Sequence, residues 1–359
     1  MLRLLMLLAA FAAPPAPPHG HVAVSVPRSY EVWDGTVAGR VSAGTEAVSV
    51  RAGKHRWVVP VGPKGRFSAT VGPVPWGDPH VQVAGAKVAP VYGVPEASVR
   101  PLEPPRNDRR LAAKLALLAH DASPQVGIYA WKANGDAAAY NAGAQFEAAS
   151  TLKLPVMITA LSGLSGELST SQYWDPFGRI TRYSDNVAAN QVLELMAGSD
   201  EAGAARMVAF VKSLGLTGTF MEGGYLTGDG GGRPGVSIVD PPPTAYKHTT
   251  PADMARLAGD LVAAAAGRGP LIRKRVSPHE ARELLYLMLH AEDPGLVPAG
   301  AHGLPVAHKI GWLEDTDNDV AIVFAPAGPT VITIYTVGAE DSTTARFGAD
   351  ATSAVLAAG

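Results

Sequence analysis

The stretch from Ala149 to Pro155 holds the first residues whose types and spacing could do chemistry. Ser150 and Lys153 are three residues apart, and the apolar run that follows is long enough for a buried helix of about three turns. On a helix that starts near Ser150, the two side chains lie on one face, within reach of each other. Burial and the positive end of the helix dipole both lower the pKa of a lysine, so a neutral Lys153 could take the proton of Ser150 and make it a nucleophile. Alone, the same residues also describe a serine helix cap followed by a solvated lysine.

Two later stretches contain residue types that could serve such a nucleophile. Ser184, Asp185 and Asn186 precede an apolar helical run, where they could also be no more than a helix cap. Lys309 and Gly311 lie on an expected strand, where a lysine near a glycine is equally typical of an edge strand with a bulge. The order of the three stretches along the chain is therefore more informative than any one of them.

The hydrophobic pattern predicts the elements that would position these side chains. A helix over residues 107–120 and a hairpin over residues 126–140 lead to Ser150, and a mostly helical middle follows. Three strands and a closing helix are expected at the end, over residues 305–313, 319–325, 330–337 and 343–357. This order predicts an α+β domain, in which helices flank an antiparallel sheet assembled from both ends of the domain, with a helical subdomain inserted between them.

Together and in this order, the three stretches resemble those of the penicillin-recognising serine hydrolases, and within them the class A β-lactamase-like family. The resemblance runs from about Asn107 to the C-terminus. Besides the three stretches it includes the approach to the nucleophile at residues 146–149 and a helix start at residues 249–255. It implies a β-lactamase/transpeptidase-like domain over residues 106–359.

The resemblance implies catalytic roles for four residues. Ser150 would attack a β-lactam or a D-alanyl-type amide and be acylated, and Lys153 would activate it. Ser184 would pass the proton to the leaving nitrogen. Glu222 lies at about the right distance after Ser184 for the glutamate that holds the deacylating water, although a surface loop carboxylate is the alternative. In the family an asparagine helps that glutamate to orient the water, and Thr227 stands in its place here. We therefore expect deacylation to be slower than acylation.

The resemblance also implies residues that would bind the substrate. Asn186 would hold the amide side chain of the substrate, and Lys309 would supply a positive field for its carboxylate. The backbone N–H of Trp312, beside Gly311, would complete an oxyanion hole with the N–H of the nucleophile. Ile310 stands where the family usually has Thr or Ser, so one hydroxyl for the substrate carboxylate is missing.

The residues before this domain predict export and an additional module. Residues 1–16 have the form of a secretory signal peptide, and a frayed apolar N-terminus on a cytosolic protein is the alternative. Short β-rich runs over residues 22–99, split by Gly and Pro, predict a small Ig-like all-β sandwich, and residues 100–105 a Pro-rich linker. Because every candidate catalytic residue follows the linker, we expect the module to be separable.

Composition limits the classes of partner. A net charge of −2 over 359 residues gives no reason to expect a nucleic-acid partner. The ten histidines show no metal-binding spacing, so neither a metal nor another cofactor is expected, and the absence of cysteine excludes disulfides and a lipid-anchoring cysteine. We expect a secreted or periplasmic monomer that acts on a small-molecule β-lactam or a cell-wall peptide.

Three functions agree with these observations. The first is an exported serine hydrolase that is acylated on Ser150 and hydrolyses the acyl-enzyme, as a class A-like β-lactamase of antibiotic resistance does. The second is a D-Ala-D-Ala peptidase of the penicillin-binding type, which shares the acylation apparatus and differs in deacylation. The third is a non-hydrolysing wall-binding protein that keeps the fold.

Overall fold

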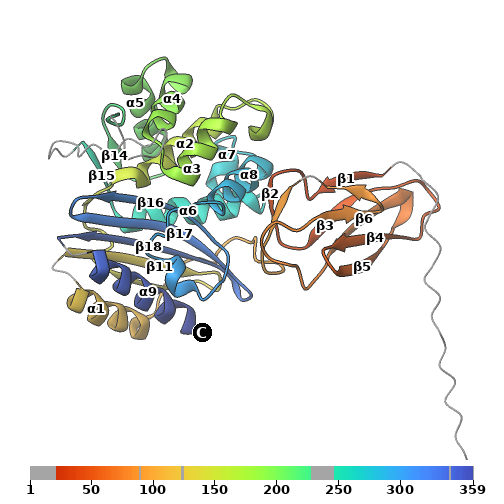
Figure 1. The fold of residues 1–359 in the computed structure, drawn as a ribbon, viewed down its shortest axis with the longest axis horizontal. Coiled ribbons are helices and arrows are strands. Elements are labelled where there is room, and N and C mark those ends of the chain that lie inside the picture. Colours follow the sequence, from red (N-terminus) through yellow and green to blue (C-terminus); the bar gives the residue numbers. More distant parts are fainter. Residues whose placement is uncertain (1–21, 89, 123–124, 228–245, 339–340, 359) are drawn as a thin grey trace, which may run out of the picture.

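The computed structural model describes residues 22–88, 90–122, 125–227, 246–338 and 341–358. The expected signal peptide and the glycine- and proline-rich part of the loop after Thr227 lie outside the described residues. Figure 1 shows a slender β-rich module at the N-terminal side and a larger domain of helices and strands. The predicted α+β class, with a β-rich region in front, is therefore confirmed.

The N-terminal module consists of two small antiparallel sheets that share one core. Their strand orders are β1-β3-β6 and β5-β4-β7-β8. The elements are β1 (Ala23–Val26), β3 (Thr36–Arg40), β4 (Ala47–Ala52), β5 (His55–Pro60), η1 (Pro63–Gly65), β6 (Arg66–Thr70), β7 (Val81–Val83) and β8 (Ala86–Lys87). In β4, Val48 and Val50 are buried and the residues between them are less so, the period of two that a strand with one face in a core shows. Phe67 and Val81 from the two sheets meet in this core.

A short parallel pair of strands packs the module against the larger domain. Strand β2 (Glu31–Trp33) pairs with β9 (Val91–Gly93), and every residue of β2 is buried. Val32 and Val94 belong to the apolar core of the larger domain, together with Val99. This shared core argues against the expectation of a freely separable module.

Charged groups accompany the apolar contact between the two parts. Oε1 of Glu31 lies 2.5 Å from Nδ1 of His279 in the larger domain, and both side chains are buried. Arg28 pairs with Glu167 across the same contact. Each pair joins a module residue to a residue of the larger domain, and the one between Glu31 and His279 is buried in the contact.

A six-stranded sheet forms the centre of the larger domain, in the order β10-β12-β11-β18-β17-β16. The strands are β10 (Arg106–Asn107), β11 (Gln125–Lys132), β12 (Asp136–Tyr140), β16 (Val306–Leu313), β17 (Thr316–Ala325) and β18 (Gly328–Val337). Strand β11 runs antiparallel to β18, with Gln125 opposite Val337 and Lys132 opposite Thr330. The sheet is therefore assembled from both ends of the domain, as the sequence predicts.

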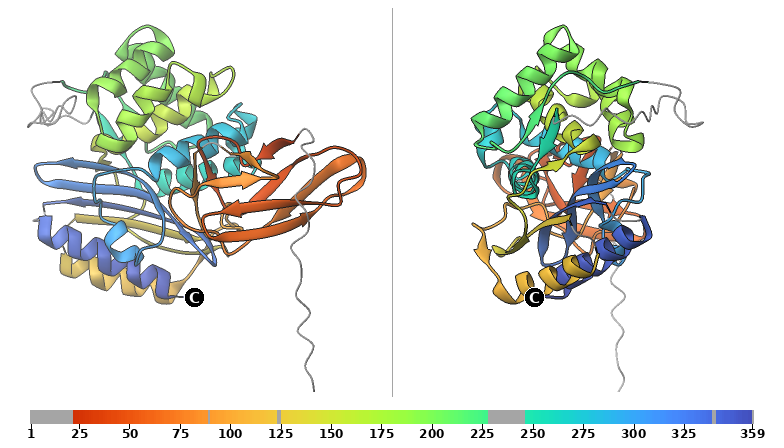
Figure 2. Two further views of the ribbon diagram at one scale, coloured as in Figure 1. Left: turned by 45° about the vertical axis from the view of Figure 1, so that its right-hand side comes forward. Right: turned by 90° about the vertical axis from the view of Figure 1, so that its left-hand side faces the viewer.

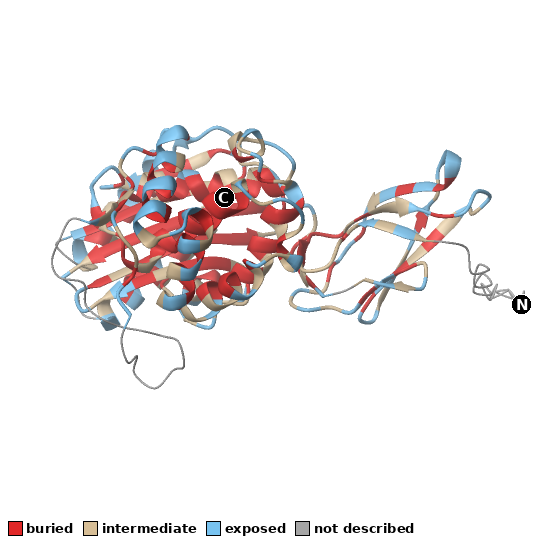
Figure 3. Ribbon diagram, turned by 90° about the horizontal axis from the view of Figure 1, so that it is seen from above, coloured by how far each residue is buried: buried red, intermediate tan, exposed pale blue. Residues whose placement is uncertain are grey.

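Helices cover both faces of this sheet (Figure 2). Helices α1 (Arg109–Ala122) and α9 (Asp341–Ala357) pack on one face, and α6 (Pro251–Ala265) and α8 (Pro278–Met288) lie on the other. In β18, Ile332 and Ile334 belong to the first apolar layer and Val331 and Tyr335 to the second, as the alternation of side chains along a strand requires. Figure 3 shows the strands buried between these layers.

A helical subdomain lies above the second layer (Figure 1). It contains α2 (Lys153–Ser162), α3 (Trp174–Tyr183), α4 (Asn186–Ala197) and α5 (Asp200–Ser213). Helix α2 is buried along residues 153–161, as its uninterrupted apolar sequence predicts. The remaining elements are β13 (Phe146–Glu147), η2 (Ala149–Leu152), η3 (Leu168–Thr170), β14 (Phe220–Met221), β15 (Lys247–Thr249), α7 (Pro270–Arg273) and η4 (Pro298–Ala301). Within the described ranges, the helices are too short or too polar to cross a membrane.

Candidate active site

Ser150 lies on a tight turn, η2, that leads directly into α2. Lys153 is the first residue of that helix. Ala149, just before Ser150, has a φ of 47°, a left-handed conformation that costs on the order of 1–3 kcal/mol in a residue other than glycine. Thr151 holds the turn in place, since its hydroxyl donates to a backbone carbonyl at 2.6 Å and accepts from the hydroxyl of Tyr335 at 2.9 Å.

The amine of Lys153 lies at the centre of the site, in a fully buried side chain. Its Nζ donates to Oγ of Ser150 at 2.8 Å, to the backbone carbonyl of Ser184 at 2.5 Å and to Oδ1 of Asn186 at 2.5 Å. Oγ of Ser184 lies 3.4 Å from the same nitrogen. The first and second stretches singled out in the sequence therefore meet at this amine.

Burial holds the pKa of Lys153 well below its usual value, because an ammonium group loses its hydration there. The charge of Lys309 lowers this pKa further, whereas the carboxylates of Asp185 and Asp293 act in the opposite direction. An amine of lowered pKa that contacts a serine hydroxyl can serve as its base.

The second stretch forms the break between α3 and α4. Ser184 ends α3 in the left-handed conformation, with a φ of 57°. Asp185 caps α4, since its carboxylate accepts from two N–H groups of the first turn at 2.8 and 3.2 Å. The same carboxylate forms an ion pair with Arg179 on α3. The helix cap that the sequence suggests is present, and it holds the hydroxyl of Ser184 beside the amine of Lys153.

Strand β16 brings Lys309 to the other side of Ser184. Nζ of Lys309 donates to Oγ of Ser184 at 2.8 Å and to the carbonyl of Ile310 at 2.7 Å. Burial lowers the pKa of Lys309 to about 8, although the carboxylates of Asp293 and Asp319 act to raise it. Ser184 therefore lies between two buried amines.

Gly311 marks the point where β16 passes the nucleophile. A Cβ at this position would lie 2.8 Å from the backbone nitrogens of both Ser150 and Thr151, too close for any other residue. Trp312 comes next on the strand, with 41% of its side chain exposed. The N–H groups of Ser150 and Trp312 thus belong to two backbone segments in contact, as an oxyanion hole requires.

Glu222 is not brought into this group of residues. It follows β14 with an exposed side chain, and its backbone N–H donates to the carbonyl of Tyr246 at 2.9 Å. Among the described residues, the hydrogen-bond partners of Lys153 are Ser150, Ser184 and Asn186. The role of Glu222 in deacylation stays a prediction, and its exposed position does not favour it.

Tyr225, which sequence reasoning missed, lies beside the central amine instead. The centroid of its ring is 4.6 Å from Nζ of Lys153, and its hydroxyl is buried without a hydrogen-bond partner among the described residues. The side-chain amide of Asn190 accepts from the N–H of Tyr225 at 2.6 Å and donates to its carbonyl at 2.7 Å. Asn190 lies four residues after Asn186, on the same face of α4. This spacing was the available signal that Asn190 faces the site.

The described part of the chain contains no group of three or more His, Asp or Glu side chains that could hold a metal ion. The groups that the site offers for chemistry are two serine hydroxyls, two amines of lowered pKa and backbone N–H groups.

A family model for the β-lactamase enzyme family matches residues 172–358. The chain belongs to this family. The matched range includes Ser184, Asn186 and Lys309 but begins after Ser150 and Lys153, so the place of the last two in a β-lactamase-family site rests on the contacts described above. No curated protein matches the sequence.

Solved structures show the same fold for this β-lactamase-family chain. An ancestral class A β-lactamase is 22% identical, with a TM-score of 0.54 over 69% of this chain and 100% of that one. A β-lactamase from Sphaerobacter thermophilus is 20% identical, with a TM-score of 0.54 over 69% and 97% of the two chains. A variant of the penicillin-binding protein PBP-A, solved as an acyl-enzyme complex with penicillin G, is 20% identical, with a TM-score of 0.54 over 71% and 97%. The predicted resemblance and fold are confirmed.

Proposed function

We propose that this protein is a serine hydrolase that is acylated on Ser150 by β-lactams or by D-alanyl-type amides. The observation that carries the proposal is the 2.8 Å contact between Oγ of Ser150 and the buried, low-pKa amine of Lys153. A hydroxyl in contact with such an amine has a base within proton-transfer distance. Membership of the β-lactamase family supports the same chemistry.

Acylation would use the described groups in sequence. The neutral amine of Lys153 takes the proton of Ser150 as Oγ bonds to the substrate carbonyl, and the oxyanion that forms is stabilised by the N–H groups of Ser150 and Trp312. Ser184 then gives its proton to the leaving nitrogen as the carbon–nitrogen bond breaks. Its own proton is replaced from Lys153, which has taken the proton of Ser150 and lies within reach of its oxygen. The charge of Lys309 attracts a substrate carboxylate.

A second candidate, an enzyme of the penicillin-binding type that keeps its acyl group, is favoured by Tyr225. An aromatic ring lies beside Lys153, and the carboxylate of Glu222 is exposed. Deacylation needs a base to activate water near the ester, and a tyrosine whose pKa is raised by burial does not provide one at neutral pH. We therefore propose that deacylation is slow. Export to the periplasm or medium, and a monomeric state, are also proposals.

The test is covalent labelling of the full chain. A fluorescent penicillin should label the protein and add its mass to the peptide that contains Ser150, and Ser150→Ala should abolish both signals. Ser213→Ala is the control, because Ser213 is an exposed serine on α5. Labelling that persists in Ser150→Ala, or no labelling of the folded parent, would refute acylation on Ser150.

Turnover separates the two candidates once acylation is established. A β-lactamase should hydrolyse a chromogenic cephalosporin through many cycles. An enzyme of the penicillin-binding type should show a burst of one product molecule per protein, followed by a slow steady state, and should release D-alanine from a D-Ala-D-Ala peptide.

A further inference from the structure

One face of the N-terminal module carries a row of exposed cations. In the sheet β5-β4-β7-β8, Arg56 lies opposite Arg51, and Arg51 lies opposite Gln82. Gln82 in turn lies opposite Lys87. All four side chains are exposed, whereas the residues directly before and after Arg51 and Gln82 are buried in the core of the module. Because side chains alternate between the two faces of a sheet, the row crosses all four strands on the outer face.

Carboxylates do not neutralise this row. The four strands contain neither Asp nor Glu. Within the part of the chain that the structure describes, no ion pair joins Arg51, Arg56 or Lys87 to an acidic side chain. Residues 22–99 hold eight Lys or Arg and five Asp or Glu, whereas the whole chain holds 30 and 32. The module is therefore positive on a chain that is slightly negative.

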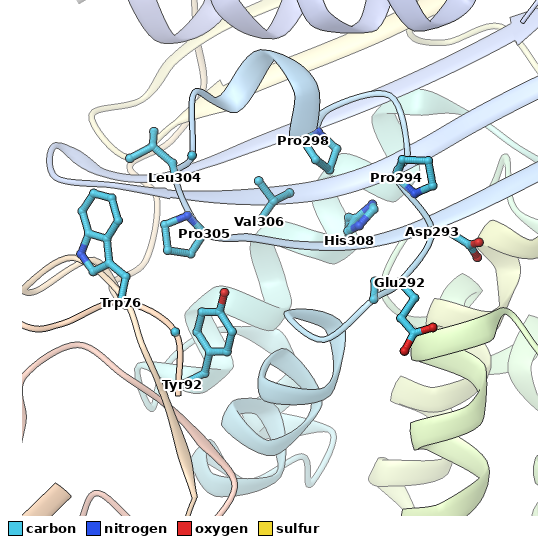
Figure 4. A pocket seen from close by; sticks show the side chains of 13 residues that line it. Trp76, Tyr92, Glu292, Asp293, Pro294, Pro298, Leu304, Pro305, Val306 and His308 are labelled. Carbon is cyan, nitrogen blue, oxygen red and sulfur yellow. The ribbon is translucent and has the colours of Figure 1, made fainter. Parts of the chain in front are cut away.

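Acidic side chains of the module are engaged away from the row, mainly at its contact with the larger domain. Glu31 and Asp78 each contact a histidine of that domain, at 2.5 and 3.1 Å. At the same contact, Trp76 and Tyr92 line a cavity of about 450 Å³ between the module and the larger domain (Figure 4). Glu96 accepts from a backbone N–H inside the module at 2.6 Å. The outer face is therefore left with its positive charge.

Protection of the sheet edges does not account for the whole row. Charged side chains on an edge strand discourage pairing with another chain, which suffices for Arg56 on β5 and Lys87 on β8. Arg51, however, lies on β4, between two other strands, and directly opposite Arg56. Like charges in that position destabilise a sheet. A bound anion would remove this cost, so the row is typical of an anion-binding surface.

The spacing of the row indicates the kind of anion. A guanidinium matches a phosphate through two parallel hydrogen bonds, and the row has two arginines. Neighbouring strands are about 4.8 Å apart, so Arg51 and Lys87, two strands apart, are separated by about 10 Å. A single phosphate cannot contact both of them. Successive phosphates of a linear polymer that lies across the strands can.

Nucleic acid bases and membranes lack their usual contacts on this face. Single strands of nucleic acid are bound by stacking of bases on aromatic rings. His55 and Trp57 alternate with Arg56 and so lie on the other face of the sheet, where their rings stack on each other at 5.7 Å between centroids. Val58 is exposed on the outer face beside the row, and one valine offers little apolar area to a membrane.

We propose that the outer face of the sheet β5-β4-β7-β8 binds a linear phosphodiester polymer without bases, of the poly(glycerol phosphate) type. Arg51 and Arg56 hold neighbouring phosphates, and Lys87 holds one further along the polymer. The proposal does not depend on acylation at Ser150. Because the module packs against the larger domain, the bound polymer would keep the candidate active site near it.

The test is the fluorescence anisotropy of end-labelled poly(glycerol phosphate) titrated with the full chain. Three neutralised phosphates give a slope of about −2 in log affinity against log salt, so binding should weaken about 15- to 20-fold between 50 and 200 mM salt. Arg51→Gln together with Arg56→Gln should weaken binding at 50 mM salt by about tenfold or more and bring the slope to about −0.7. Lys87→Gln alone should bring it to about −1.4.

Arg40→Gln together with Arg66→Gln is the matched control. These two arginines are also exposed and opposite each other, on β3 and β6 of the other sheet of the module. The control removes the same charge from the module and leaves the row intact, so binding should stay within about twofold of the parent. Melting temperatures establish that the variants remain folded.

An equal loss of affinity in the two double variants, or no binding by the parent at 50 mM salt, would overturn the inference. Tighter binding of an oligothymidylate with the same number of phosphates would replace it by a nucleic-acid surface. Binding confined to phosphatidylglycerol vesicles would replace it by a membrane surface. Displacement by millimolar inorganic phosphate at constant ionic strength would replace it by a site for a single phosphate.

Discussion

Lys153 and Lys309 approach the same oxygen atom, the hydroxyl of Ser184, at 3.4 and 2.8 Å. Two buried amines this close disfavour each other's charge, and the pKa of Lys153 is lowered in part by Lys309. The pair can therefore divide the work, with one amine neutral as a base and the other charged as an anion site.

The rate of acylation should show a bell-shaped dependence on pH. It rises as Lys153 loses its proton, at a pH well below the usual value for lysine, and it falls above about pH 8 as Lys309 loses its charge. The measurement is the labelling rate with a penicillin from pH 5 to pH 10. In Lys309→Arg, whose side chain stays charged, the fall near pH 8 should disappear. A rate that does not change over this range would contradict the division of roles.

Lys153→Ala and Ser184→Ala should each slow acylation by about 10² to 10⁴-fold, or roughly 3 to 5 kcal/mol, because each removes a positioned proton-transfer group. Melting temperatures of both variants establish whether they remain folded. Stopped-flow labelling gives the rates. Lys212→Ala, at an exposed lysine on α5, is the control and should match the parent.

Tyr225→Glu should shorten the lifetime of the acyl-enzyme by about tenfold or more. The change places a carboxylate beside Lys153, where it can act as a base for water. The side chain of Asn190 holds the backbone of residue 225 through its N–H and its carbonyl. Tyr225→Phe, which keeps the ring, should leave the lifetime within about twofold. Mass spectrometry at intervals after mixing with penicillin measures it. Glu222→Gln should also have no effect, and a longer lifetime in that variant would restore Glu222 as the base.

Gly311→Ala should slow acylation by about 10²-fold and destabilise the protein by about 1–3 kcal/mol, because the new Cβ would be 2.8 Å from two backbone nitrogens that cannot easily move. Labelling rates and urea unfolding test the two effects. Gly178→Ala on α3 is the control, since a Cβ there meets nothing within 4 Å. Parent-like acylation in the Gly311 variant would show that β16 does not lie against the nucleophile.

A chain that begins at Asn107 should melt at a lower temperature than one that begins at Val22. It loses the buried side chains of Val32 and Val94, each worth about 1.5–3 kcal/mol, and the pair between Glu31 and His279. Thermal unfolding with light scattering compares the two chains. Equal melting temperatures and no aggregation would show that the module is separable after all.

Much of the hydrolase domain was predictable because its signals are local. The helix expected over residues 107–120 is found at Arg109–Ala122, and the three terminal strands lie within a few residues of their expected bounds. The contact between Ser150 and Lys153 follows from their spacing on one turn. Their meeting with Ser184 and Lys309 followed only from the resemblance, since nothing in the spacing of distant stretches requires it.

The features that escaped prediction depend on contacts between distant residues. Asn190 and Tyr225 are 35 residues apart, and the loop that carries Tyr225 has no periodic pattern to indicate which side chain turns inward. Likewise, β2 is a three-residue strand that looks like its neighbours in the module, although its partner β9 lies far along the chain and Val32 packs in the other domain. Whether the module separates from the larger domain could therefore not be judged from the proline-rich linker alone.

The pairing of β11 with β18 also delays the completion of the candidate site during synthesis. Strands β16, β17 and β18 leave the ribosome long after Ser150, yet β16 carries Lys309 and presses Gly311 against the nucleophile. Until those strands arrive, β11 and β12 form only a hairpin, and the buried surroundings that lower the pKa of Lys153 are incomplete. Long-range pairing of this kind is slow to form. A nascent or truncated chain would therefore be unreactive toward acylating agents, and reactivity would appear abruptly once the last strands dock.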